Sequence, residues 1–374
     1  MKTALQIKKR SLFSLSCLGL CLLILCAGNP AWAHPQGSVG HPATFVSAPA
    51  DLEEPETVFQ LFQQTEVQEV ILETDLQKLI DNKMTDDYQK AQIRFDDAQG
   101  QSFSRKIKIK VRGKSRRKLC AFPPIMLKFK KNDLLGMGLD SAYNKVKLVT
   151  HCMDDPEGEQ YLLKEYLAYN LYNQLTERSL QVKLFRIRYV DSKGNQPDEI
   201  KYGFLIENHH EMAQRIQGKA FKQYGTTAKD YQAKAYAQMV LFQYMIGNTD
   251  WGAEIMRNIK LIRPNQQGQG IIPVPYDFDF SGLVNSNYAK PNPDFEELET
   301  VTQRRIMAQC SAEKDLLDAV ALFNQRQRNL FQTVIGFELL PDKERGRVAR
   351  YLGEFFKLIN DPSFIQTELK KNCS

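Results

Sequence analysis

The chain has 374 residues and a formal charge of +6. Its first 33 residues hold four of the cations and no acid, so subtracting them leaves 341 residues with a charge of +2. This near balance argues against a general nucleic-acid binder, and the remaining length suffices for one large domain or two smaller ones with a hydrophobic core.

The N-terminus has the pattern of a secretory signal peptide over residues 1–33. A basic start precedes an apolar run over 12–27, and Ala31-Trp32-Ala33 forms a small-x-small cleavage site. Lipidation at Cys26 is disfavoured by the bulky Leu25 before it. We expect an exported protein, periplasmic or extracellular after cleavage near Ala33. No later segment approaches the length of an apolar membrane span, so no transmembrane segment is expected in the mature chain.

Four cysteines follow the signal peptide, namely Cys120, Cys152, Cys310 and Cys373. An even number of cysteines in an exported chain indicates up to two disulfides, with three possible connectivities. Free buried thiols are the alternative. A zinc site that uses His151 and Cys152 is less favoured, because the chain contains no CxxC pair.

Strand patterns dominate the first half of the mature chain. Residues 34–66 are rich in Pro, Gly, Ser, Ala and acids without periodicity, which predicts a flexible linker. Beyond it, Lys106, Lys108 and Lys110 alternate with apolar residues and lead to Arg112, so one face of this strand is apolar and the other is cationic. The patterns predict strands over 67–72, 91–95, 103–111, 125–129, 145–149, 183–190 and 200–206, a short helix through 79 and a longer helix over 158–176.

Helix patterns dominate after residue 208. They cover 230–246, 312–336 and 342–359, and two short strands over 258–262 and 271–275 interrupt them. A strand-rich first half and a helical second half predict an α+β fold with two packed lobes and a cleft between them. The predicted N-lobe covers 67–207, and the predicted C-lobe covers 208–374.

The densest set of functional groups lies at the end of the second short strand. Asp277 and Asp279 are two residues apart, so in an extended chain both carboxylates point to the same side. Such a pair repels unless a proton or a cation intervenes, and Mg²⁺ prefers oxygen ligands of this kind. Asn258 can add a neutral oxygen, and Asp250, in a loop after a helix, is suited to orient or deprotonate a hydroxyl. Ordinary turn acids are the alternative.

Cationic residues that can face these acids come from two segments. Lys147 lies in the predicted strand 145–149, and the following helix carries Lys164 and Glu165. A strand lysine paired with a helix acid positions phosphates in kinases, whereas a solvated lysine and a surface acid are the alternative. Residues 112–118 form a basic turn that can cradle phosphates, although it lacks the Walker spacing and also fits a solvated loop.

At these segments the sequence resembles the spore coat protein H (CotH) family of atypical secreted kinases, and within it a branch of exported bacterial proteins. Val111-Arg112-Gly113 with its basic turn begins the match, and the block 273–282 is its most specific part. The other matching segments are 145–149, 162–175, 202–207, 248–251 and 257–258, so the resemblance runs in family order over roughly 170 residues.

The resemblance implies a two-lobed, atypical protein-kinase-like fold that uses ATP and Mg²⁺ (or Mn²⁺). By motif match, Asp250 would be the catalytic acid/base, and Asp277 and Asp279 would be the metal ligands. Asn258 would contact the metal or a phosphate.

Further roles follow from the same match. Lys147 and Glu165 would be the phosphate-positioning pair, and Arg112 would contact the nucleotide. Glu207 would lie near the adenine pocket, where the first lobe joins the second. Two departures stand out, because Arg257 occupies the place of a common His, and Tyr276 and Phe278 stand where family members often carry Trp.

Three functions are consistent with these residues. The first is an exported kinase that transfers the γ-phosphoryl group of ATP to a protein or surface-polymer acceptor. The second is a non-catalytic, pseudokinase-like scaffold that binds a partner in the cell envelope. The third and weakest is a metal-dependent phosphoesterase that uses the same acids. No nucleic-acid partner is expected.

Overall fold

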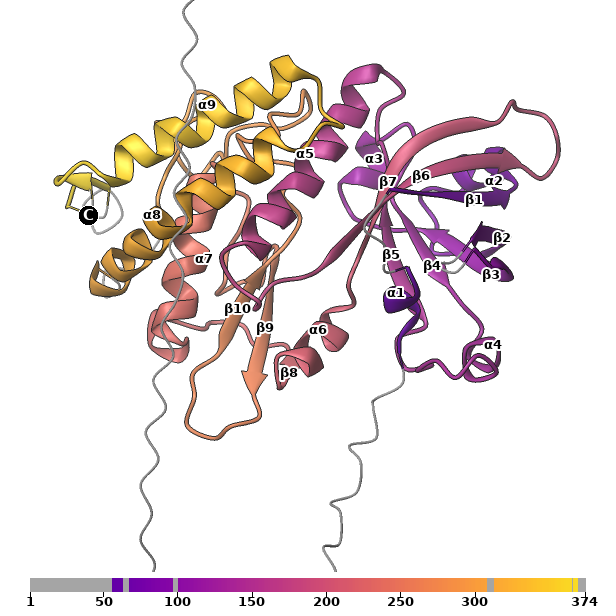
Figure 1. Ribbon diagram of the computed structural model, residues 1–374, viewed down its shortest axis with the longest axis horizontal. Helices are drawn as coiled ribbons and strands as arrows, with labels where there is room; N and C mark the ends of the chain where they lie inside the picture. Colours follow the sequence, from indigo (N-terminus) through magenta and orange to yellow (C-terminus); the bar gives the residue numbers. More distant parts are fainter. Residues whose placement is uncertain (1–55, 63–66, 97–99, 308–312, 365, 369–374) are drawn as a thin grey trace, which may run out of the picture. The chain divides into compact units, whose positions relative to one another are not determined.

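The computed structural model describes residues 56–62, 67–96, 100–307, 313–364 and 366–368 (Figure 1). All of them belong to one structural unit, which spans residues 54–374. The predicted signal peptide, most of the predicted linker, Cys310 and Cys373 lie outside the described residues.

Seven strands close into a barrel in the order β1-β2-β3-β4-β5-β7-β6. Neighbouring strands are antiparallel except at the closure, where β1 pairs in parallel with β6 and Gln68 lies opposite Phe185. The strands are β1 Gln68–Thr74, β2 Gln89–Asp96, β3 Ser102–Val111, β4 Ile125–Lys128, β5 Lys145–Val149, β6 Val182–Asp191 and β7 Glu199–Ile206. The expected α+β class is therefore confirmed, but the sequence patterns did not predict a closed barrel.

The alternation along β3 fixes which face lies inside the barrel. Ile107, Ile109 and Val111 are buried, and Lys106 and Lys108 between them are exposed. Aromatic rings add to this interior, because Phe62 packs against both Phe95 and Phe185 at centroid distances of 4.5 and 5.3 Å. The cationic face of β3 consequently lies on the outside of the barrel.

The long helix α5, Pro156–Asn173, connects β5 to β6 and packs against the helical half of the chain. Asp155 caps its first turn by accepting a hydrogen bond from the backbone N–H of Gly158, and proline follows at the first helical position. The helix contacts β6 and β7 of the barrel and also α8. Four shorter helices accompany the barrel, namely α1 Val58–Leu61, α2 Leu76–Asp81, α3 Arg116–Leu119 and α4 Lys131–Leu135, whereas α6 His209–Arg215 follows β7 and contacts β8.

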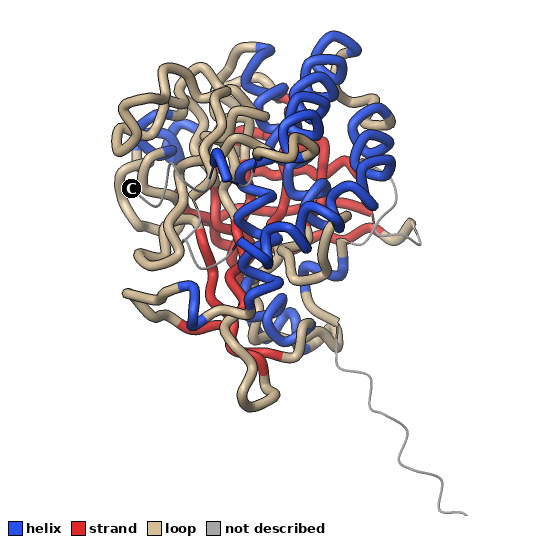
Figure 2. The backbone as a smooth tube through the Cα atoms, turned by 90° about the vertical axis from the view of Figure 1, so that its left-hand side faces the viewer, coloured by secondary structure: helices blue, strands red, loops and turns tan. Residues whose placement is uncertain are grey.

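A second hydrophobic cluster, separate from the barrel interior, joins α5 to the C-terminal elements. A three-stranded sheet in the order β10-β9-β8 and a chain of contacts from α7 through α8 to α9 build it. Its elements are β8 Gly218–Phe221, η1 Ala228–Asp230, α7 Ala233–Met245, β9 Ile259–Pro264, β10 Ile272–Pro275, α8 Glu313–Ile335 and α9 Asp342–Ile359. Between β10 and α8, the described residues 276–307 form loops and turns, drawn in tan in Figure 2.

The Cys120–Cys152 disulfide joins the end of α3 to the link between β5 and α5. It confirms one of the disulfides expected from the cysteine count, and it rules out a zinc site that uses the Cys152 thiolate. His151 beside it is fully buried and stacks on Phe122, and burial lowers its pKa to about 4. None of the described helices is both long enough and apolar enough to cross a membrane.

Candidate metal and phosphate site

Three carboxylates from two distant segments converge on the Arg116 side chain. Its Nη2 lies 2.7 Å from Glu165 Oε2 and 3.2 Å from Asp277 Oδ1, and its Nε lies 2.8 Å from Asp279 Oδ2. Arg116 comes from α3 and Glu165 from α5, whereas the two aspartates follow β10. One oxygen of each acid lies within 4.8 Å of the others, so the acidic triad has the spacing of a potential metal site.

The chain after β10 turns sharply to present these acids. Asp277 has a φ of 67°, in the left-handed region, and its backbone N–H donates to the Tyr169 hydroxyl at 2.9 Å. Phe278 packs beneath, with its ring centroid 4.6 Å from that of Tyr169. The two aspartates thus reach the same guanidinium from different environments, because Asp279 is buried and the Asp277 side chain is 44% exposed.

The Arg116 guanidinium alone does not balance the charge of the acidic triad. One guanidinium faces three carboxylates, two of which are buried. Burial raises the pKa of Glu165 to about 8, and Asp279 and Asp277 add to the effect while Arg116 opposes it. Burial also raises the pKa of Asp279 against the influence of Arg116. Burial therefore favours a proton or a bound cation on the two buried acids, Glu165 and Asp279.

The second oxygen of Glu165 indicates where such a cation fits. Glu165 Oε1 is buried and has no hydrogen-bond partner among the described residues. A buried carboxylate oxygen without a partner is costly, and hard divalent cations bind oxygen ligands. The donor set of Glu165, Asp277 and Asp279 therefore fits a divalent metal that neutralises the triad alongside Arg116.

Asp250 and Asn258 form a second group beside the triad. The Asn258 side-chain amide donates to the Asp250 backbone carbonyl at 2.7 Å and to its Oδ2 at 3.0 Å. Arg257 lies 3.9 Å from the same carboxylate. Burial raises the pKa of Asp250, and Asp277 and Asp279 raise it further while Arg257 and Asn258 oppose the shift. Asp250 is thus held in a defined orientation, and its pKa depends on the charge of the acidic triad.

Cations face Asp277 from the barrel and from β9. The ammonium groups of Lys147 and Lys260 lie over the Tyr276 ring, 5.4 and 4.6 Å from its centroid. Burial lowers the pKa of Lys147 to about 7, and Arg112 and Lys260 lower it further while Asp277 opposes them. Burial also lowers the pKa of Arg112, and Asp277 again opposes the effect. Arg112, Lys147 and Lys260 form a cationic cluster, and the carboxylate of Asp277 alone does not neutralise its charge.

One expected contact differs in the structure, and a second expected site residue is bound internally. Glu165 pairs with Arg116, and in the described part of the chain Lys147 forms no ion pair with it. The expected Lys147–Glu165 pair is wrong because the connection between β3 and β4 inserts Arg116 next to α5. Glu207 is buried and bound internally, since Arg215 Nε and Nη2 and the Gln181 backbone N–H donate to its carboxylate at 2.8–2.9 Å. Its contact with an adenine base stays a prediction.

The site residues that the sequence did not predict are those whose side-chain direction depends on the fold. Arg116 belongs to the basic turn, but spacing alone does not tell which of its cations points inward. Lys260 is the second residue of β9, whereas Asn258 lies just before the strand with a φ of 52°, so strand alternation does not relate their side chains. Tyr169 is one of several buried residues of α5, and its position in the sequence does not distinguish it from the others.

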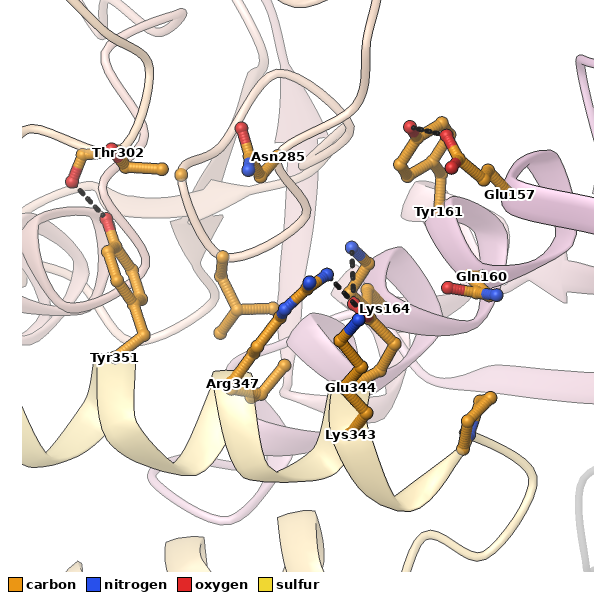
Figure 3. Close-up of a pocket in the computed structure, with 14 residues that line it drawn as sticks. Glu157, Gln160, Tyr161, Lys164, Asn285, Thr302, Lys343, Glu344, Arg347 and Tyr351 are labelled. Atoms are coloured by element: carbon orange, nitrogen blue, oxygen red, sulfur yellow. Dashed lines mark hydrogen bonds and ion pairs between the residues drawn. The ribbon is translucent and has the colours of Figure 1, made fainter.

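A separate cavity of about 480 Å³ lies between α5, the 282–302 segment and α9 (Figure 3). Lys164 points into it and lies 3.5 Å from Glu344 of α9, and Arg347 pairs with the same glutamate. Lys164 is therefore engaged with α9, away from the acidic triad. Neither a scan against models of protein families nor a search of curated proteins found a match to this chain.

Proposed function

We propose that this protein is a metal-dependent phosphotransferase with a kinase-like, two-lobed architecture, the barrel serving as N-lobe and the helical half as C-lobe. It would transfer the γ-phosphoryl group of ATP to a hydroxyl of a protein or surface polymer. The observation that carries the proposal is the opposition of the Arg112, Lys147 and Lys260 cluster to the carboxylate of Asp277, beside which Asp250 is held by Asn258.

The cationic cluster supports a phosphate-binding role. Burial and mutual repulsion disfavour the charged form of Lys147, so a bound anion would relieve an electrostatic cost already present in the fold. The ammonium groups of Lys147 and Lys260 each lie over the Tyr276 ring, and the charge of Lys260 lowers the pKa of Lys147, so the two cations interact. Phosphate oxygens are the ligands that such convergent cations bind well.

The acidic residues support the other half of the reaction. Asp277, Asp279 and Glu165 would hold a divalent ion, which supplies charge neutralisation to the phosphates, and Asn258 would add an oxygen. Asp250 would accept the proton of the acceptor hydroxyl as its oxygen bonds to the γ-phosphorus and the bond to the ADP oxygen breaks. The Arg116–Glu165 pair would take the positioning part that a lysine–glutamate pair plays in protein kinases.

A non-catalytic scaffold is a second candidate, and one observation favours it. Arg116 already binds all three acids of the acidic triad, so a cation is present where the metal would act. In a scaffold, this arginine would lock the barrel-side helix α3 to α5 and to the segment after β10 without turnover.

Titration calorimetry of the chain without its predicted signal peptide, using Mg-ATP and Mn-ATP, tests the proposal. We expect binding by the wild type and by Asp294→Asn, an exposed acid of the same loop segment, and a loss of at least about tenfold in affinity for Asp277→Asn. Absence of nucleotide binding with every divalent metal would overturn the kinase assignment.

A phosphoryl-transfer assay then separates the two candidates. Asp250→Asn is expected to retain nucleotide binding and to lose about 100-fold or more in transfer rate, because the general base is removed. Nucleotide binding with no transfer to any acceptor supports the scaffold. Phosphate release from a simple ester without ATP would point to a phosphoesterase instead.

A further inference from the structure

The outer face of the barrel carries a row of lysines that crosses four adjacent strands. The register places Lys90 of β2 opposite Lys108 of β3, Lys108 opposite Lys128 of β4, and Lys128 opposite Lys145 of β5. Directly opposed residues share one face of a sheet and lie about 5 Å apart. The four lysines thus form a line of positive charge perpendicular to the strands.

This lysine row lacks neutralising partners within the described structure. None of its four lysines lies within ion-pair distance of a described carboxylate, whereas the neighbouring Lys110 pairs with Asp86 at 3.2 Å. Like charges placed directly opposite one another destabilise a sheet. The row therefore carries an electrostatic cost that an anionic ligand would remove.

A groove at one end of the row gives it depth. The groove has a volume of about 580 Å³, and five of its nine lining residues are lysines, namely Lys108, Lys128, Lys130, Lys131 and Lys145. No acidic residue lines it, and among the described residues Asp133, 4.0 Å from Lys130, is the one carboxylate within ion-pair distance of these lysines. Most small-molecule pockets of this size are lined by apolar side chains, so this groove calls for a strongly anionic occupant.

We propose that this lysine groove, continued by the row, binds a chain of phosphate groups. Lysines hold phosphates as point charges, and a linear array of them matches repeated charges along a chain. Nucleic acid is disfavoured because Phe129, the aromatic residue that lines the groove, is buried, and the Tyr88 ring beside the row already faces the ammonium of Lys128. The phosphates would belong to inorganic polyphosphate or to a polyol-phosphate polymer.

The groove is distinct from the acidic triad and does not depend on the proposed catalytic activity. Lys145 and Lys147 are alternate residues of β5, so both project to the outer side, but only Lys147 lies over Tyr276 beside the site. A variant of the groove can therefore be tested for binding whether or not phosphoryl transfer occurs.

The test measures binding of fluorescent long-chain polyphosphate by anisotropy to the chain without its predicted signal peptide, with tripolyphosphate and a glycerol-phosphate polymer as competitors. Lys128→Gln/Lys145→Gln is expected to weaken binding at least tenfold and to flatten its salt dependence. Lys78→Gln/Lys193→Gln, which removes the same charge from exposed sites on α2 and the β6–β7 turn, is expected to change it less than twofold.

The competitors identify the source of the phosphates. Displacement by the glycerol-phosphate polymer at lower charge concentration than by tripolyphosphate supports a polymer ligand, and the reverse order supports free polyphosphate. Equal weakening in both double variants would overturn the proposal, as would equal or tighter binding of poly-glutamate or single-stranded DNA. Thermal unfolding provides the folding control, because removal of opposed lysines is expected to leave the melting temperature unchanged or raised.

Discussion

Arg116 is the residue on which the geometry of the site depends. Its removal leaves Glu165 and Asp279 buried without their cation. We expect Arg116→Gln to lower the free energy of unfolding by about 3–5 kcal/mol, as is usual when one partner of a buried ion pair is deleted. Its neighbour Arg117 pairs with the exposed Asp86 and donates to the backbone carbonyls of Thr85 and Val111, so Arg117→Gln is expected to cost less, about 1–2 kcal/mol. Urea denaturation measures both, and equal losses would contradict the buried role of Arg116.

The acidic triad also predicts a pH dependence of stability. The pKa of Glu165 is raised from its ordinary 4.5 to about 8, so the folded protein binds more protons than the unfolded chain between these values. The free energy of unfolding should then fall as the pH rises through this window. The measurement is the melting temperature between pH 5 and pH 8 without metal, and Glu165→Gln serves as the control.

Other groups titrate in the same range, so the difference between the wild type and Glu165→Gln carries the prediction. Lys147 has its pKa lowered to about 7, which makes stability rise with pH near neutrality, and Glu211 has its pKa raised to about 7, which acts in the opposite direction. Both are present in each variant. Parallel pH profiles for the two proteins would exclude Glu165 as the source.

At the residue scale, the sequence predicted which acids come together better than it predicted which cation points towards them. Asp277, Asp279 and Glu165 were chosen from the sequence and do come together in space. The cation between them was assigned to Lys147, because a strand lysine before a helix acid is a familiar pattern. Whether Arg116 of α3 or the strand lysine fills that space depends on how the β3–β4 connection folds back, which residue spacing does not encode.

Among the elements, α3 is short and carries Arg116, so its anchoring matters. Cys120 directly follows α3, and its disulfide to Cys152 joins it to the segment before α5, which carries Glu165. Cross-linking residues 32 positions apart is expected to contribute about 3–4 kcal/mol through the loop-closure entropy of the unfolded chain.

We expect Cys120→Ser/Cys152→Ser to lose stability of this order, measured by denaturant titration. The same titration of the wild type in reducing buffer should match the double variant. If the oxidised and reduced proteins unfold at the same denaturant concentration, the disulfide does not anchor α3.

Element prediction succeeded where periodic patterns are long. The patterns over 158–176, 312–336 and 342–359 correspond to α5, α8 and α9, which present apolar faces over several turns. The strand β8 and the helix α6 were missed, because four and seven residues give too little periodicity to detect. Their positions follow from tertiary pairing with β9 and from the cap that Asn208 provides to α6.

At the scale of the whole molecule, barrel closure could not be read from local patterns. The alternation of apolar residues along β1 predicts a strand with one buried face, but it does not predict that the neighbouring strands are β2 and β6. The pairing of strands that are more than a hundred residues apart, such as β1 and β6, depends on the total apolar area buried in the barrel interior. The same holds for α5, whose leucines indicated a helix without indicating that it joins the hydrophobic cluster of the C-terminal elements.

The strand pairing predicts whether a core mutation mainly slows folding or mainly speeds unfolding. Leu72 in β1 and Ile107 in β3 are both buried in the barrel. Ile107 lies in the local β2–β3 hairpin, so Ile107→Ala is expected to slow folding, whereas Leu72→Ala is expected mainly to speed unfolding. Stopped-flow chevrons of both variants, each expected to lose about 2–5 kcal/mol, provide the measurement. A folding rate reduced more by Leu72→Ala would contradict this order.

The parallel pairing of β1 with β6 also has a consequence for biosynthesis. A ribosome delivers β1 early, but its parallel partner is complete only when residue 191 has emerged. Until then one edge of β1 exposes unpaired backbone groups, which are a template for pairing with other chains. The nascent protein therefore passes through a long interval in which its first strand has only β2 beside it, and a holding chaperone would be most useful during that interval.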